Sequence, residues 1–178
     1  MNDANSSMQL TRAADYAVRV MIHLVGRAED GRVSLPAVAA ATGAPESFLS
    51  KVLQALTRGG LLVSQRGQAG GFEVSARGKK ASMRDVIEAV DVPIHLNVCL
   101  TSGKACARQN WCPAHPVWVR AQEAMLKVLE DARIEDLAVG GASLDGTPGR
   151  QPSVVVSGIA ASAASGHDGC RCGEVTPG

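Results

Sequence analysis

The sequence lacks any apolar run of the roughly 18 residues that a membrane-spanning helix requires. Its first residues, MNDANSSMQL, also lack the basic segment and apolar core of a secretory signal. Both absences predict a cytoplasmic protein with no membrane partner. Five cysteines in 178 residues are an odd number for a disulfide framework. In a reducing compartment, clustered cysteines are more often metal ligands or redox groups than structural disulfides.

The chain is long enough for one domain, or one domain with an appendage. The net charge of +1 conceals an asymmetry between its two halves. Residues 1–85 hold 11 Lys and Arg against 7 Asp and Glu, whereas residues 86–178 hold 7 against 10. The front half is therefore mildly basic, as a nucleic-acid-binding half would be.

The first third of the chain carries three helical patterns. Apolar residues recur at helical spacing over residues 11–27, with Thr11 as the N-cap. Ser34 is expected to cap a short helix that Gly43 ends. A third helix opens at Pro45 and stops at the glycine pair 59–60. Two short helices joined by a tight turn are typical of a helix-turn-helix motif, although many helical proteins contain that arrangement without binding DNA.

The segment LLVSQRGQAGGFEVS predicts a hairpin directly after the third helix. Strands are expected at 61–64 and 72–75, with a glycine-rich turn between them. A hairpin in this place makes a winged helix. The glycine spacing fits neither the dinucleotide fingerprint nor the P-loop. Arg66, near the turn, favours a wing because a guanidinium there could enter a minor groove.

The third helix carries polar residues opposite its apolar stripe. Their side chains can donate hydrogen bonds to phosphates and base edges: Gln54 could pair with adenine, and Lys51 could contact guanine or phosphate. A solvated face is the alternative for any single residue, but the helix, its donors and the wing together favour DNA binding. The expected DNA-contacting residues are Ser47, Ser50, Lys51, Gln54, Arg58 and Arg66.

After a short helix capped by Ser82, the sequence HPVWVRAQEAMLKVLEDARIEDL predicts a long amphipathic helix of some 17 residues, about 26 Å at 1.5 Å per residue. Such a helix has little core of its own to cover, so we expect it to pack against a second copy. A homodimer would present two wings and two recognition helices to a palindromic duplex. From about Val139 the composition predicts a flexible tail, in which Cys170 and Cys172 have no assigned role.

Between these helices lies the polar loop CLTSGKACARQNWCPAH, which contains Cys99, Cys106, Cys112 and His115. Thiolates bind soft metals, and a flexible loop can wrap three of them around one centre. The wide spacing ranks an iron–sulfur cluster above zinc, whose structural sites use tight Cys-x₂₋₄-Cys knuckles. A redox-switched disulfide, which needs no metal, ranks third.

Four segments, in the order MQLTRAADYAVRVMIHL, PESFLSKVLQALTRGGLL, SQRGQAGGF and the three-cysteine loop, closely resemble the winged-helix iron–sulfur transcription regulators typified by IscR and NsrR. The resemblance runs from about residue 8 to residue 138. It implies a winged helix-turn-helix DNA-binding domain at 8–80, a cluster-binding loop and dimerisation helix at 81–138, and a tail at 139–178 outside the family pattern. The implied fold is mainly α with a small β-wing.

The same resemblance implies that Cys99, Cys106 and Cys112 are cluster ligands. In IscR-like members a histidine three residues after the last cysteine completes a 2Fe–2S site, and His115 stands there. In NsrR-like members an aspartate early in the first helix, from the other subunit, completes a 4Fe–4S site, and Asp15 stands there. His115 and 2Fe–2S are favoured, although the first cysteine interval is one residue longer than the IscR pattern.

The expected function is a homodimeric transcription regulator, a repressor, whose promoter affinity follows cluster or iron status, nitric oxide or redox state. A zinc-bound or metal-free thiol switch on the same fold is the alternative, together with an iron–sulfur redox module that does not bind DNA. An enzyme is not expected, because no nucleophile elbow is present and the remaining histidines have no evident acid–base partners.

Overall fold

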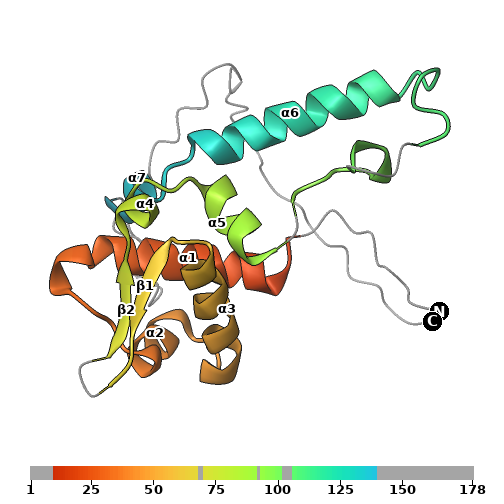
Figure 1. Ribbon diagram of the computed structural model, residues 1–178. Helices are drawn as coiled ribbons and strands as arrows, with labels where there is room; N and C mark the ends of the chain where they lie inside the picture. The colour runs from red at the N-terminus through yellow and green to blue at the C-terminus, as the bar shows by residue number, and fades with distance from the viewer. Residues whose placement is uncertain (1–9, 68–69, 92, 102–105, 140–178) are drawn as a thin grey trace, which may run out of the picture.

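The computed structural model in Figure 1 describes residues 10–67, 70–91, 93–101 and 106–139. The predicted tail lies outside these residues, except that Val139 ends the last helix, and Cys170 and Cys172 lie outside them too. The elements follow in the order α1 (Arg12–Gly26), η1 (Ala28–Asp30), α2 (Leu35–Thr42), α3 (Glu46–Arg58), β1 (Leu62–Gln65), β2 (Gly71–Val74), α4 (Ala76–Lys79), α5 (Met83–Val90), η2 (Val98–Leu100), α6 (His115–Asp131) and α7 (Ile134–Val139). The described fold is mainly α with one small antiparallel sheet, as the sequence predicts.

Side-chain hydroxyls cap the starts of the first two helices. The Thr11 side chain accepts a hydrogen bond from the Ala14 amide at 3.2 Å, which caps α1. Ser34 caps α2 in the same way, and Gly43 ends that helix with a φ of 68°. Pro45 is the N-cap of α3 and lies just outside its first turn. These local signals are those that the sequence predicts.

The wing is a two-stranded sheet in which β1 and β2 pair antiparallel, from Leu62 opposite Val74 to Gln65 opposite Gly71. Both strands are shifted by one residue from the predicted ranges. Val33 extends the sheet through an isolated bridge with Phe72, and its amide donates to the Phe72 carbonyl at 2.9 Å. The linker between α1 and α2 thus lies along the outer edge of the wing.

The core lies where α1, α3 and α5 meet, and α7 also packs on α1. The apolar stripe predicted for α3 is buried there, opposite its polar face. The largest fully buried side chains include Met21, Leu49, Leu53, Leu56, Leu61, Ile87 and Ile134.

Helix α6 lies apart from this core, across the end of the molecule opposite to α2 (Figure 1). It packs on α5 and η2, and none of its 17 residues, all of which the structure describes, is buried. Its C-terminal end is fastened to the domain by backbone pairing. The Met83 amide donates to the Ala132 carbonyl at 2.9 Å, and the Ile134 amide donates to the Ala81 carbonyl at 3.0 Å. We call these paired segments, residues 81–83 and 132–134, the clamp.

Candidate functional site

The outward face of α3 presents the polar side chains that the sequence predicts. Ser47, Lys51, Gln54 and Arg58 are exposed, and Ser50 is half-buried. The Gln54 amide donates to the Ser50 hydroxyl at 3.3 Å, which joins two of these side chains one turn apart. Because the opposite stripe is buried in the core, this face is held outward. It offers donors of the kind that read base edges and phosphates in a major groove.

Arg66 directly follows β1 and is exposed, next to Gly67 with a φ of 113°. Residues 68–69 of the turn lie outside the described residues. Figure 1 shows the ends of β1 and β2 that lead to this turn at the same end of the molecule as α2. The wing and the helix-turn-helix motif therefore face the same side, as they must to contact one duplex.

Two side chains that follow β2 connect the wing to the end of α3. The Arg77 guanidinium donates to the Gly59 carbonyl at 2.7 Å, and the Ser75 hydroxyl donates to the Gly60 carbonyl at 2.7 Å. Gly60 has a φ of 72°, which favours glycine. These bonds hold α3 and the wing in one fixed relation, and the sequence patterns give no sign of them.

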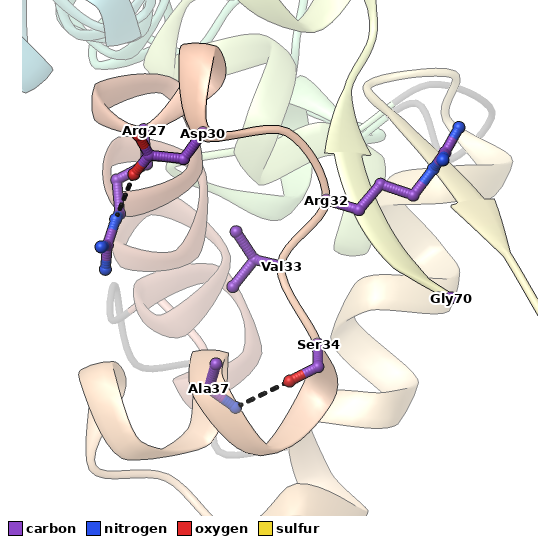
Figure 2. Close-up of a pocket in the computed structure, with 7 residues that line it drawn as sticks. All are labelled: Arg27, Asp30, Arg32, Val33, Ser34, Ala37 and Gly70. Carbon is purple, nitrogen blue, oxygen red and sulfur yellow. Dashed lines mark hydrogen bonds and ion pairs between the residues drawn. The ribbon is translucent and has the colours of Figure 1, made fainter. Parts of the chain in front are cut away.

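A cavity of about 620 Å³ lies between the α1–α2 linker and the wing (Figure 2). Its walls include two arginines that the sequence reading did not single out. Both are paired with carboxylates: Arg27 with Asp30 at 2.9 Å, and Arg32 with Glu73 of the wing at 3.5 Å. The second pair ties the linker to β2 and so supports the outer edge of the wing.

The cysteine segment enters through η2, which contains Cys99, and leads through consecutive turns into α6. The Gln109 amide donates to the Cys106 carbonyl at 2.9 Å, and the His115 amide donates to the Cys112 carbonyl at 3.1 Å. Cys99, Cys106 and Cys112 are half-buried free thiols. Among the described residues, no three His, Cys, Asp or Glu side chains are gathered into a group that could hold a metal ion.

The donor chemistry of this segment nevertheless suits a soft metal group, because it combines three thiols with an imidazole. The Nε2 atom of His115 is buried and has no hydrogen-bond partner. An unsatisfied buried nitrogen costs about 1–3 kcal/mol, which coordination to a metal would remove. The residues therefore fit a cluster in their chemistry, although the structure does not bring the three sulfurs together.

Asp15 lies in the first turn of α1, and its carboxylate is already engaged. The Arg19 guanidinium contacts both of its oxygens, with Nε to Oδ1 at 3.3 Å and Nη2 to Oδ2 at 3.1 Å. Arg19 also lies over the Tyr16 ring at 5.5 Å. Asp15 would have to give up this bidentate pair before it could bind a metal.

The helix-turn-helix motif, its outward donors and the wing define a winged helix-turn-helix DNA-binding protein. The chain belongs to the Rrf2 family: a family model described as "Iron-dependent Transcriptional regulator" matches residues 10–140. It is a helix-turn-helix transcriptional regulator of that family and not an enzyme. No helix among the described residues is long and apolar enough to span a membrane.

Relatives within this family differ in what their names record. The chain is 30% identical to the regulator NsrR of Geobacillus kaustophilus, over 77% of this chain and 94% of the relative. It is 28% identical to the regulator IscR of Klebsiella pneumoniae, over 81% and 87% respectively. The solved structure of CymR, named as the global cysteine regulator of B. subtilis, superposes with a TM-score of 0.58 at 26% identity, covering 74% of this chain and 96% of CymR.

Proposed function

We propose that this regulator is a homodimeric repressor whose affinity for a palindromic promoter site is controlled by an iron–sulfur cluster bound by Cys99, Cys106, Cys112 and His115. The observation that carries the proposal is the buried, unpartnered Nε2 of His115, one turn after the last of three free thiols. The iron-dependent description of the family and the likeness to IscR and NsrR support it.

In this proposal residues 8–80 bind DNA, residues 81–138 hold the cluster and the dimer helix, and residues 139–178 form a tail. Ser47, Ser50 and Gln54 of α3 contact base edges, and Lys51 and Arg58 contact bases or phosphates. Arg66 reaches the minor groove from the wing. All six side chains lie on the polar face of α3 or beside the turn of the wing, and none of them belongs to the buried core.

When bound, the cluster would be a group whose charge and ligands change with iron supply, nitric oxide or oxidants. The chain contributes one thiol from η2, one from each of two later turns, and an imidazole at the head of α6. His115 is the better fourth ligand because its nitrogen has no other partner, whereas Asp15 is paired with Arg19. This difference favours the 2Fe–2S form over the 4Fe–4S form.

The dimer contact is assigned to α6. Val117 is 65% exposed, and Trp118 and the half-buried Leu129 lie on the same helix, which packs mainly on α5 and η2 in the described part of the chain. An apolar helix face of this kind is stabilised by a second copy. The clamp joins this helix to the domain that carries α3, so changes in the cysteine segment can alter how the two DNA-reading domains are spaced.

Native mass spectrometry of the freshly purified protein under anaerobic conditions tests the proposal. A dimer that carries one 2Fe–2S cluster per chain is expected. A 4Fe–4S mass would transfer the fourth-ligand role to Asp15. A zinc adduct, or a metal-free chain with an internal disulfide, would refute the iron–sulfur sensor and leave a thiol switch on the same DNA-binding fold.

The regulatory step is tested by Cys106→Ala, which should lose the cluster and change its affinity for a palindromic duplex selected from a random-sequence library. Cys170→Ala removes a cysteine outside the loop and is the matched control. Unchanged DNA affinity in Cys106→Ala would refute control by the cluster without touching the fold.

A further inference from the structure

In the part of the chain that the structure describes, two histidines have a buried ring nitrogen without a hydrogen-bond partner: Nε2 of His115 and Nδ1 of His95. Buried polar atoms are satisfied in the great majority of cases, so each exception requires an explanation. His115 has one in the proposed cluster. The unpartnered nitrogen of His95, four residues before Cys99, has no such explanation. The two histidines stand at opposite ends of the cysteine segment.

The backbone beside His95 is fixed against α6. The Leu96 amide donates to Oε1 of Gln122 at 3.1 Å, and η2 packs on the same helix. Gln122 is seven residues after His115, so the two lie on one face of α6, two turns and about 10 Å apart. The segment that carries His95 and Cys99 is therefore held along the flank of α6 that His115 begins.

The chain also keeps His95 within reach of the thiols. Four residues separate it from Cys99, so their Cα atoms lie at most about 14 Å apart even in a fully extended chain. The 3₁₀ turn at Val98–Leu100 shortens that distance further. At the other end of the segment, the His115 amide is bonded to the Cys112 carbonyl. Each outer cysteine thus has a histidine close to it in the chain.

We propose that His95 is a second nitrogen ligand for the metal group, able to occupy through Nδ1 the fourth position that His115 otherwise fills. This inference rests on the proposed function. Three thiolates and two imidazoles give five donors for four ligand positions. One histidine can then leave the metal while the other takes its place, and the group is retained during the exchange. A neutral imidazole can make such a bond at either nitrogen.

The test compares iron and acid-labile sulfide per chain in the anaerobically purified full-length protein and three variants: His95→Asn, His115→Gln and the double variant. The asparagine amide approximates the position of Nδ1, and the glutamine amide that of Nε2, so each replacement keeps a polar group in place. His23→Asn, which alters a half-buried histidine of α1, is the matched control. Thermal unfolding of the metal-free forms establishes that each variant is folded.

Each single variant is expected to retain most of the wild-type iron and sulfide, and the double variant to hold at most about a tenth of the iron and sulfide that His115→Gln holds. The electron paramagnetic resonance signal of reduced His115→Gln should be shifted but present. A double variant that holds as much iron as His115→Gln would overturn the role of His95 alone. Wild-type protein without iron and sulfide would overturn the proposed function as well.

Discussion

Removing two positive charges from the proposed DNA-contacting surface, with Lys51→Ala and Arg66→Ala together, should weaken DNA binding without affecting the fold. Both side chains are exposed and make no ion pair with other described residues. Substitutions of this kind change stability by no more than about 0.5 kcal/mol. Any loss of DNA affinity would therefore come from lost contacts with the duplex.

The size of the effect follows from counterion release. Each phosphate contact contributes about 0.9 to the slope of log K against log salt, so two charges on each chain of a dimer contribute about 3.6. Between roughly 50 and 200 mM salt, the wild type should lose about 150-fold more affinity than the variant loses. Fluorescence anisotropy with a labelled palindromic duplex over this salt range measures both slopes.

The matched control is Lys79→Ala with Lys80→Ala, which removes the same charge from the last residue of α4 and from the residue that follows it. Helix α4 lies at the end of the domain away from α2 (Figure 1). The salt slope of this control should remain close to that of the wild type. Equal slopes in the wild type and the Lys51/Arg66 variant would refute the placement of these residues on DNA. An equal reduction in the control would show that net charge, and not this surface, determines binding.

Three further substitutions test separate parts of the molecule. Ile134→Ala empties a fully buried position of the clamp and should lower the free energy of unfolding by about 2–5 kcal/mol in urea titrations; a loss below about 1 kcal/mol would contradict that anchoring role. The hydrogen bond from the Ser82 amide, assisted by the Ser82 hydroxyl and opposed by partial burial, holds the pKa of Asp85 below its ordinary value. Because the pKa is depressed in the folded state, the ionised carboxylate stabilises the fold, and Asp85→Asn should lower the free energy of unfolding at pH 7 by about 1 kcal/mol. The difference between variant and wild type should shrink as the pH falls below about 4. A difference that does not change with pH would refute this role of the carboxylate. Asp15→Asn removes the exposed ion pair with Arg19 and should lower the free energy of unfolding by no more than about 1 kcal/mol. Its iron content should equal that of the wild type, and a loss of iron would favour Asp15 over His115 as the fourth ligand.

Sequence patterns predicted the elements whose signals are local. Thr11, Ser34 and Ser82 each cap the helix that follows them, and the capping box of Ser82 with Asp85 is complete. The wing is predictable because glycines interrupt two short strand patterns. The polar face of α3 is predictable because its residues alternate with a buried apolar stripe. In each case the necessary information lies within a few residues.

The parts that escaped prediction depend on contacts between distant segments. The clamp pairs Met83 with Ala132, 49 residues later, and no periodicity in either segment signals that pairing. Helices α4 and α7 have four and six residues, too few for a helical pattern to stand out. In the sequence His95 is only a histidine without an evident acid–base partner, and it is the burial of its unpartnered Nδ1 in the structure that draws attention to it.

The clamp fixes the C-terminal end of α6 to the domain that carries α3, and the N-terminal end of the helix continues from the cysteine segment. Its 17 residues are about 25 Å long, so a pivot of roughly 8° about the clamp displaces the His115 end by about 3.5 Å. A rearrangement around Cys112 and His115 that displaces this end of α6 by a few ångströms thus corresponds to a rotation of only a few degrees at the clamp.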